Sequence, residues 1–236
     1  MRLTIKHYYH FNKAINRDNV LICQDGWDSV RLDSEDTPFS IPHSAEAYEA
    51  KLIKAYTVEA NEICDVINKN NFHTIFSIGC GCGFLEANIK KKMPEIYVAC
   101  SDFNPKSVNQ LKSVMTYYDE LNTFDITKDQ FPFKDNQLYL LFRIDTELSD
   151  QEWKQVFNRM AEEGVETILI VATELLTLQR FIKESIKGAL RNIKGYTFCG
   201  YIRSKANFKA LWKGHYSVEK ELKIGSLDAF LLKIDL

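Results

Sequence analysis

The sequence predicts an α/β protein built around a doubly wound, mostly parallel β-sheet with helices on both faces. Two observations lead to this fold class. Short apolar runs alternate with amphipathic segments between Thr74 and Thr173, which is the pattern of successive strand–helix–strand units. The last of these runs, Glu166–Thr173, is almost entirely β-branched or apolar, as strands of a parallel sheet are when helices cover both of its faces.

The segment before this region is predicted to form a hairpin followed by one long helix. Val20–Cys23 and Ser29–Leu32 flank Asp25-Gly26, a dipeptide typical of hairpin turns. Ser44 is a suitable N-cap, and apolar residues recur behind it at helical spacing. We therefore expect a single helix over Ala45–Asn68.

The remaining elements are predicted from periodicity and from the residues that flank each segment. Strands are expected at Thr74–Ile78, Ile96–Asp102, Leu121–Asp125, Gln137–Ile144, Glu166–Thr173, Tyr216–Ile224 and Ala229–Leu236. Helices are expected to begin at Phe84 and to cover Pro105–Met115, Asp150–Glu163, Leu178–Ile193 and Ser204–Trp212. Asp150 is expected to cap its own helix.

Composition is that of an ordinary single-domain protein. The chain has 236 residues, of which 45% are apolar and 26% charged, and its net charge of −2 gives no global bias towards nucleic acid or membranes. Its six cysteines include no C-x-x-C pair, so we expect reduced thiols, no metal site and a cytoplasmic location. Neither a signal-peptide core nor a membrane-spanning stretch is recognisable.

The most informative stretch is the loop Gly79-Cys80-Gly81-Cys82-Gly83, which joins a predicted strand to a predicted helix. Glycines allow positive φ and let a ligand approach the bare backbone, and the amino end of the helix offers free N–H groups. The dinucleotide fingerprint G-x-G-x-x-G needs a third glycine where this chain has Phe84. The spacing instead resembles motif I of class I S-adenosylmethionine-dependent methyltransferases, although Ser77 stands where that family usually has a carboxylate.

This resemblance extends over about Ala45–Leu236 and implies a seven-stranded sheet. The closing hairpin would provide the sixth and seventh strands, with the last strand antiparallel. The single domain would then consist of an N-terminal extension (1–43), a cofactor-binding core (44–173), a lid insertion before the sixth strand (174–203), and a C-terminal helix and hairpin (204–236). The extension and the insertion are expected to cover the acceptor.

The resemblance also implies that S-adenosyl-L-methionine is the cofactor. In open α/β sheets the ligand lies beyond the carboxyl ends of the strands. Asp102 matches the acidic residue that holds the ribose, and a second role is open for it as the N-cap of the helix at Pro105. As a ribose ligand, Asp102 would contribute little to stability without the cofactor. The expected cofactor-binding residues are Gly79, Cys80, Gly81, Gly83, Asp102, Phe103, Asn104, Asp125, Ile126, Arg143 and Ile144.

Candidate catalytic and acceptor residues follow the same topology. Asp145, just after the fourth strand, could accept a proton from the acceptor, or it could be a surface or capping residue. His43 is a second candidate base, with a structural or exposed histidine as its alternative. Tyr48, Tyr201 and Arg203 are placed on the acceptor side, the last two because Gly200-Tyr201-Ile202-Arg203 resembles a G-[YW]-x-R turn of small-molecule and sugar methyltransferases.

The predicted function is methyl transfer to an oxygen or nitrogen of a small molecule. Basic residues of the tail could attract a phosphorylated or acidic glycan acceptor, or they could simply form a solvated helix face. Nucleic acid is disfavoured as a partner, whereas a protein substrate and any oligomeric state remain open. Ser77 and Tyr139 depart from the family pattern and favour the alternative of a catalytically silent binding protein. Phe84 and the C-terminal hairpin disfavour an NAD-dependent enzyme.

Overall fold

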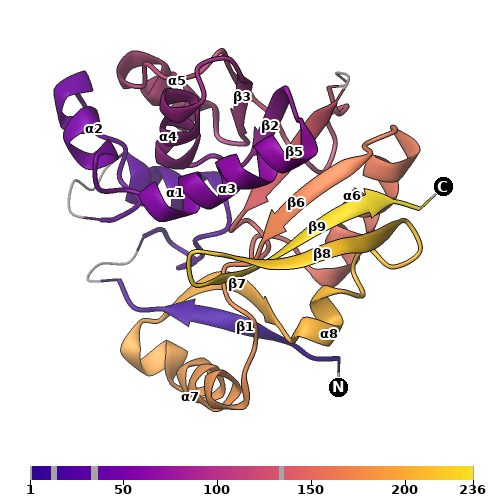
Figure 1. Cartoon of the computed structure of the whole chain (residues 1–236). Helices are drawn as coiled ribbons and strands as arrows, with labels where there is room; N and C mark the ends of the chain where they lie inside the picture. The colour runs from indigo at the N-terminus through magenta and orange to yellow at the C-terminus, as the bar shows by residue number, and fades with distance from the viewer. Residues whose placement is uncertain (1, 12–14, 33–36, 133–135, 236) are drawn as a thin grey trace.

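The computed structural model describes residues 2–11, 15–32, 37–132 and 136–235 (Figure 1). Its central sheet has seven strands in the order β4-β3-β2-β5-β6-β9-β8. The strands are β2 (Thr74–Ile78), β3 (Tyr97–Asp102), β4 (Glu120–Thr123), β5 (Gln137–Phe142), β6 (Thr167–Val171), β8 (Tyr216–Ile224) and β9 (Leu227–Ile234). Strands β2 to β6 are parallel to one another, whereas β9 is antiparallel to both β6 and β8. The predicted seven-stranded sheet with an antiparallel closing hairpin is thus confirmed.

Helices cover both faces of this sheet (Figure 1). Alternate strand residues point to opposite faces, so Ile75 packs with one set of helices and Phe76 with the other. The first face carries α2 (Ala45–Leu52), α3 (Thr57–Asn70), α4 (Phe84–Lys92) and α5 (Pro105–Val114). The second face carries α6 (Asp150–Glu162) and the short α8 (Lys205–Phe208). Tyr139 belongs to this second core and is 3% exposed.

Two predictions for the N-terminal part are wrong. In place of the hairpin, α1 (Gln24–Arg31) is a helix capped by Cys23, whose Sγ accepts a hydrogen bond from Gly26 N at 3.4 Å. A Cβ on Gly26 would lie 2.4 Å from the carbonyl oxygen of Val20, so this glycine permits close packing and not a hairpin turn. The long helix is in fact two, α2 and α3, because Tyr56 takes a left-handed φ of 51° between them.

Smaller differences concern the ends of elements. The helix α6 is capped by Ser149 and not by Asp150, since Ser149 and Glu152 form a reciprocal capping box. Strands β4, β5 and β6 each end two residues earlier than predicted. Gly200–Arg203, expected as a turn, belong to a full strand, β7 (Thr197–Arg203).

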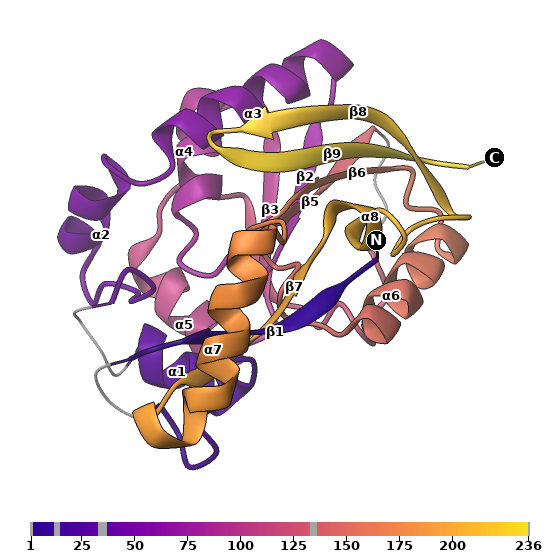
Figure 2. The same ribbon diagram turned by 90° about the horizontal axis from the view of Figure 1, so that it is seen from below.

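Strand β7 pairs with the N-terminal strand β1 (Thr4–Tyr9) to make a separate two-stranded antiparallel sheet. The helix α7 (Leu178–Lys194) packs on β1, and seen from below it lies in front of both strands (Figure 2). The N-terminal segment and the insertion before β8 therefore form one substructure at the carboxyl end of the main sheet. Because β1 and β7 are far apart in the chain, no local pattern indicates this pairing.

Candidate functional site

A cavity of about 470 Å³ opens at the carboxyl ends of β2, β3 and β5. Its floor is the glycine loop, and α1, β1 and α7 contribute its other walls. Eight of the eleven predicted cofactor-binding residues line it: Gly79, Cys80, Gly81, Gly83, Asp102, Phe103, Arg143 and Ile144. The position of this cavity agrees with the rule that ligands of open α/β sheets lie beyond the strand ends.

The glycine loop has the conformation that its sequence requires. Gly79, Gly81 and Gly83 have φ values of 74°, 59° and 66°, a region that other residues rarely adopt. A Cβ on Gly79 would lie 2.5 Å from Cγ2 of Ile144. The loop is held to β3 because the backbone N–H groups of Gly79 and Cys80 both donate to the carbonyl of Ser101, at 2.8 and 2.9 Å. The loop is therefore a rigid backbone cradle.

Asp102 is fully buried at the centre of this site. Its Oδ2 accepts a hydrogen bond from Gly81 N at 3.1 Å, and its Oδ1 accepts one from Asn104 N at 3.0 Å. The N-cap of α5 is Asn104, whose Oδ1 accepts from the N–H groups of Lys106 and Ser107. The alternative capping role of Asp102 is thus wrong, and its carboxylate faces the cavity.

Arg31 of α1 is the residue of this site that sequence reasoning missed. Its Nη1 lies 2.9 Å from Oδ1 of Asp102, and its guanidinium lies 4.4 Å from the ring centre of Trp27. Both members of the ion pair are buried. They are separated by 71 residues in the chain, and the predicted hairpin would have given Arg31 a different direction, so no sequence signal indicated the pair.

Glu86, in the first turn of α4, places a carboxylate next to Ser77. Its Oε1 accepts a hydrogen bond from Ser77 Oγ at 2.6 Å. Its Oε2 is buried and has no hydrogen-bond partner among the described residues. Glu86 lines the cavity, and burial raises its pKa to about 7, although the bond from Ser77 lowers it. The carboxylate missing at position 77 is therefore present nearby, on a helix and not on the strand.

The segment after β5 reaches the cavity as predicted, but the acid that lines the cavity is Glu147 and not Asp145. Asp145 is 1% exposed, and its Oδ1 accepts hydrogen bonds from Thr173 N and Oγ1, both at 2.7 Å. It does not line the cavity, whereas Glu147 does. Arg143 takes a left-handed φ of 59°, and this turn changes the direction of the residues that follow it.

Glu147 is half-buried and accepts a hydrogen bond from Nε1 of Trp27 at 3.2 Å. Burial raises its pKa to about 7, while the bond from Trp27 and the positive charge of Arg31 lower it. A carboxyl group with such a pKa can exchange a proton near neutral pH. Trp27 and Arg31 thus connect α1 to both acids, Glu147 and Asp102.

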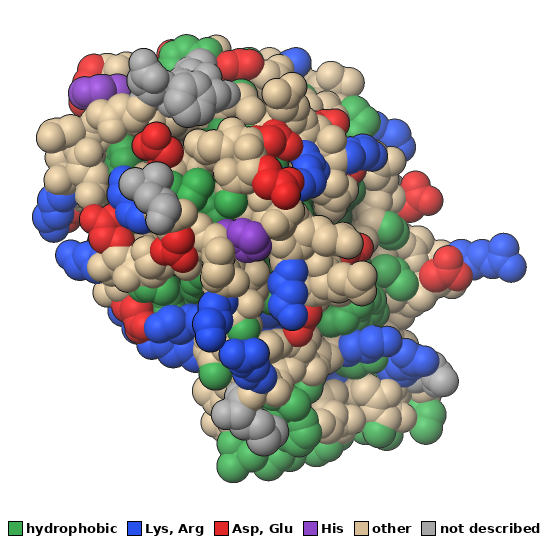
Figure 3. Space-filling model, turned by 90° about the vertical axis from the view of Figure 1, so that its right-hand side faces the viewer, with side chains coloured by type: hydrophobic (Ala, Val, Ile, Leu, Met, Phe, Trp, Pro, Cys, Tyr) green, Lys and Arg blue, Asp and Glu red, His purple; other side chains and the backbone are tan. Residues whose placement is uncertain are grey.

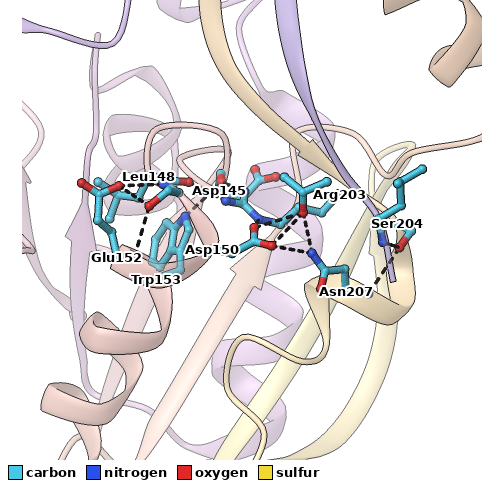
Figure 4. Close-up of polar contacts among 11 residues, drawn as sticks. Asp145, Leu148, Asp150, Glu152, Trp153, Arg203, Ser204 and Asn207 are labelled. Carbon is cyan, nitrogen blue, oxygen red and sulfur yellow. Dashed lines mark hydrogen bonds and ion pairs between the residues drawn. The ribbon is translucent and has the colours of Figure 1, made fainter. Parts of the chain in front are cut away.

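Arg203 does not line the cavity, and it binds the segment between β5 and α6 at three points (Figure 4). It is fully buried, its Nε lies 2.7 Å from Oδ1 of Asp150, and its two terminal nitrogens donate to the carbonyls of Asp145 and Leu148. Tyr201 is half-buried in β7 and does not line the cavity either. The G-Y-I-R sequence therefore holds β7 to the segment after β5.

The remaining predicted residues do not line the cavity either. Tyr48 is fully buried, and its hydroxyl donates to the carbonyl of Cys82 at 3.1 Å, which supports the glycine loop from below. His43 is exposed. Asp125 accepts hydrogen bonds from Thr127 and pairs with Lys128 at 2.8 Å, and Ile126 packs against the second core.

The outer wall of the cavity is basic. Arg180, Lys183 and Lys187 of α7 line it, together with His7 of β1. The buried Glu184 anchors this wall, since it accepts from Tyr8 N at 2.8 Å and from Lys187 Nζ at 2.7 Å. These hydrogen bonds, together with that of His7, lower the pKa of Glu184 to about 2 despite its burial. Glu174 also lines the cavity and pairs with Arg180 at 3.1 Å, so three cations against two carboxylates leave this wall with an excess of one positive charge.

Comparison with solved structures returns methyltransferases at low sequence identity. The human N-acetylserotonin methyltransferase in complex with SAM has a TM-score of 0.60 at 18% identity, covering 81% of this chain and 56% of that one. The magnesium protoporphyrin IX methyltransferase of Synechocystis PCC 6803 with bound SAM has a TM-score of 0.59 at 10% identity, covering 95% of this chain and 100% of that one. The mitomycin 7-O-methyltransferase MmcR has a TM-score of 0.56 at 14% identity, covering 89% and 70%.

These likenesses establish a common fold. The chain spans little more than half the length of the first of these structures, and the whole of the second. No protein-family model and no curated protein matches the sequence.

Proposed function

We propose that the protein is an S-adenosylmethionine-dependent methyltransferase that acts on a small-molecule acceptor. The observation that carries this proposal is the hydrogen bond between Gly81 N and Asp102, which joins the glycine loop to the acid after β3. It occurs at the carboxyl end of a sheet whose fold is shared with methyltransferases solved in complex with SAM. The fold alone does not specify a reaction, so the site residues carry the argument.

The residues present are suited to this cofactor. The bare backbone at Gly81 leaves space for a ligand, because a Cβ there would meet nothing nearer than Arg31 Nη2 at 3.5 Å. Asp102 would hold the ribose hydroxyls, and the unpartnered Oε2 of Glu86 would hold the ammonium group of the methionine part. When bound, S-adenosylmethionine supplies an electrophilic methyl group, so the protein has only to orient the acceptor and remove its proton.

Glu147 is the group that we propose as the general base. It lines the cavity, and a pKa of about 7 leaves a large fraction ionised at neutral pH. Asp145, the base expected from the sequence, does not line the cavity, and its Oδ1 accepts two hydrogen bonds from Thr173, so it would instead position the segment that carries Glu147. The acceptor would enter beneath β1 and α7, which would form its lid. The basic wall of Arg180, Lys183 and Lys187 would favour an acceptor with an anionic group, such as a phosphorylated or acidic glycan.

Calorimetry tests the cofactor. The protein should bind S-adenosylhomocysteine with a dissociation constant in the micromolar range, roughly −8 kcal/mol, and should not respond to NAD. Binding of NAD without any response to S-adenosylhomocysteine would overturn the proposal. Transfer of a labelled methyl group to phosphorylated or acidic glycan acceptors then separates an enzyme from a silent binding protein.

Glu86 provides a second, more local test. Glu86→Gln should weaken S-adenosylhomocysteine binding by at least about tenfold, because one charge-assisted hydrogen bond is worth about 1.5–3 kcal/mol. For the wild type, affinity should rise from pH 6 to pH 8 as this carboxyl, with its pKa near 7, ionises. Adding Ser77→Asp to Glu86→Gln should restore part of the affinity, since it returns a carboxylate to the same place.

The matched control is Glu95→Gln, which removes the charge of an exposed glutamate and should leave affinity unchanged. A folded Glu86→Gln protein that binds S-adenosylhomocysteine as tightly as the wild type would show that Glu86 is not a cofactor ligand.

A further inference from the structure

Arg31 occupies the part of the cavity that a bound nucleoside would need. Its Nη1 lies 2.9 Å from Oδ1 of Asp102, and its Nη2 would lie 3.5 Å from a Cβ on Gly81. The same guanidinium group therefore lies against both the carboxylate after β3 and the bare backbone of the glycine loop. Lysine and arginine side chains are spread over the visible surface of the molecule (Figure 3), whereas Arg31 is only 7% exposed. A cation in this place is part of the site and not of the solvated surface.

The carboxylate of Asp102 has little capacity left for a ribose. An ionised carboxylate offers about four acceptor sites, shared between its two oxygens. Oδ1 accepts hydrogen bonds from Arg31 Nη1 at 2.9 Å and from Asn104 N at 3.0 Å, and Oδ2 accepts one from Gly81 N at 3.1 Å. One acceptor site remains on Oδ2, whereas the two hydroxyls of a ribose need two. The other donors are backbone N–H groups, so Arg31 is the donor that can leave.

The helix α1 does not depend on this ion pair for its position. Asp28 accepts hydrogen bonds from Asn104 Nδ2 at 2.8 Å and from Lys106 Nζ at 2.6 Å, and these bonds fix α1 to the start of α5. The guanidinium of Arg31 lies 4.4 Å from the ring centre of Trp27, which lines the cavity as well. The side chain of Arg31 can therefore turn away from the carboxylate along this ring, which continues to stabilise its charge, while the helix stays in place.

We propose that Arg31 is a built-in competitor of the cofactor, which must displace its guanidinium from Asp102 before both ribose hydroxyls can bind. The inference rests on the proposed cofactor. In the free protein the ion pair balances the buried charge of Asp102 and covers the empty site. In the complex the hydroxyls replace the guanidinium on Oδ1, and Arg31 extends into the cavity beside Trp27.

This competition would regulate the site by lowering its affinity. Breaking the ion pair between Arg31 and Asp102 offsets part of the free energy gained from the ribose. The substrate and product forms of the cofactor carry the same ribose, so both would be bound less tightly than the site allows. A weaker hold on S-adenosylhomocysteine favours its release after methyl transfer, since differences in affinity appear mostly in the rate of dissociation.

Calorimetry of Arg31→Met tests the competition, because methionine removes the charge and keeps an unbranched side chain against Trp27. The variant should bind S-adenosylhomocysteine at least about tenfold more tightly than the wild type, since no charged donor then competes for Oδ1 of Asp102. The matched control is Arg159→Met. Arg159 also pairs with a carboxylate, that of Glu163 at 3.3 Å, and its guanidinium lies 5.5 Å from the ring centre of Phe131. It does not line the cavity, so the control should bind like the wild type.

Two nucleosides locate the gain in affinity at the ribose. 5′-Methylthioadenosine has both ribose hydroxyls, whereas 5′-methylthio-2′,3′-dideoxyadenosine has neither. Arg31→Met should tighten binding of the first by the same factor and leave binding of the second unchanged. A general loosening of the fold would affect both ligands alike.

NMR spectra of the arginine side chains follow the exchange in the wild-type protein and need no destabilised variant. The guanidinium protons of Arg31 should be protected from exchange with water in the free protein and should lose this protection when S-adenosylhomocysteine binds. Arg31→Lys keeps the charge beside Asp102 and identifies the signal by its absence.

Two results would overturn the competition. One is protection of Arg31 that persists in the complex. The other is a folded Arg31→Met protein that binds S-adenosylhomocysteine no more tightly than the wild type, and weaker binding would make Arg31 a ligand of the cofactor instead. If neither the wild type nor Arg31→Met bound any of these nucleosides, the proposed cofactor site itself would be wrong, which is a result distinct from normal binding without a gain.

Discussion

Asp102→Ala is expected to lose at least tenfold in S-adenosylhomocysteine affinity and also to destabilise the protein without ligand. The affinity falls because the carboxylate would accept charge-assisted hydrogen bonds from the ribose, each worth about 1.5–3 kcal/mol. The stability falls because Arg31 would keep a buried charge without its anion. Removal of one partner of a buried ion pair costs about 3–5 kcal/mol.

The loss of stability revises the expectation from sequence alone, in which Asp102 contributed little without the cofactor. Thermal unfolding and calorimetry on the same variants separate the two effects. Arg31→Ala should destabilise the protein by a similar amount, and Arg31→Ala/Asp102→Ala should recover part of that loss because both charges are gone. The double variant should still bind the cofactor weakly. Normal affinity in the folded double variant would exclude Asp102 as a ligand.

Glu147→Gln is expected to reduce kcat by about a hundredfold or more, the contribution typical of a general base. Cofactor affinity should change little, since Asp102, Glu86 and the glycine loop remain. In the wild type the rate should rise with pH and reach half of its plateau near pH 7, because burial raises the pKa of Glu147 to about 7 and only the ionised form accepts a proton. Glu147→Gln should abolish this ascending limb.

Asp145→Asn is the control for Glu147→Gln. Asparagine keeps the shape of Asp145 but not its charge, so the hydrogen bonds from Thr173 become weaker. The variant should therefore lower the stability of the protein more than it alters the pH profile of the rate. A Glu147→Gln enzyme with full activity beside an inactive but folded Asp145→Asn enzyme would return the base to Asp145, the residue expected from the sequence.

Glu147 also makes folding stability depend on pH. Its pKa is about 7 in the folded protein and near its ordinary value of 4.5 in the unfolded chain. Between these values the folded state binds the additional proton, so stability falls as pH rises from about 4.5 to 7. Glu86 acts in the same direction, because its pKa is raised in the same way. Glu147→Gln should therefore flatten this part of the stability profile.

The sequence by itself determined the central sheet and the floor of the site. The buried strands, the glycine loop and the position of Asp102 after β3 follow from periodicity and from backbone requirements that act within a few residues. The positive φ values of Gly79 and Gly81 are a local requirement of the loop and do not depend on contacts with distant segments. Because parallel strands end at a common edge, local assignments also placed Arg143 and Ile144 beside the loop.

Only the tertiary structure decided which side chains complete the site. Arg31 reaches Asp102 across 71 residues, and Glu86 meets Ser77 because helix α4 folds back over β2. The left-handed turn at Arg143 directs Glu147, and not Asp145, towards the cavity. The sequence predicted α7 as a helix, but the hydrogen bond between Glu184 and β1 decides which side of that helix faces inward and leaves Leu178, Ile182 and Ile186 exposed. Periodicity specifies that a face exists, whereas the partner that the face meets depends on contacts between distant segments.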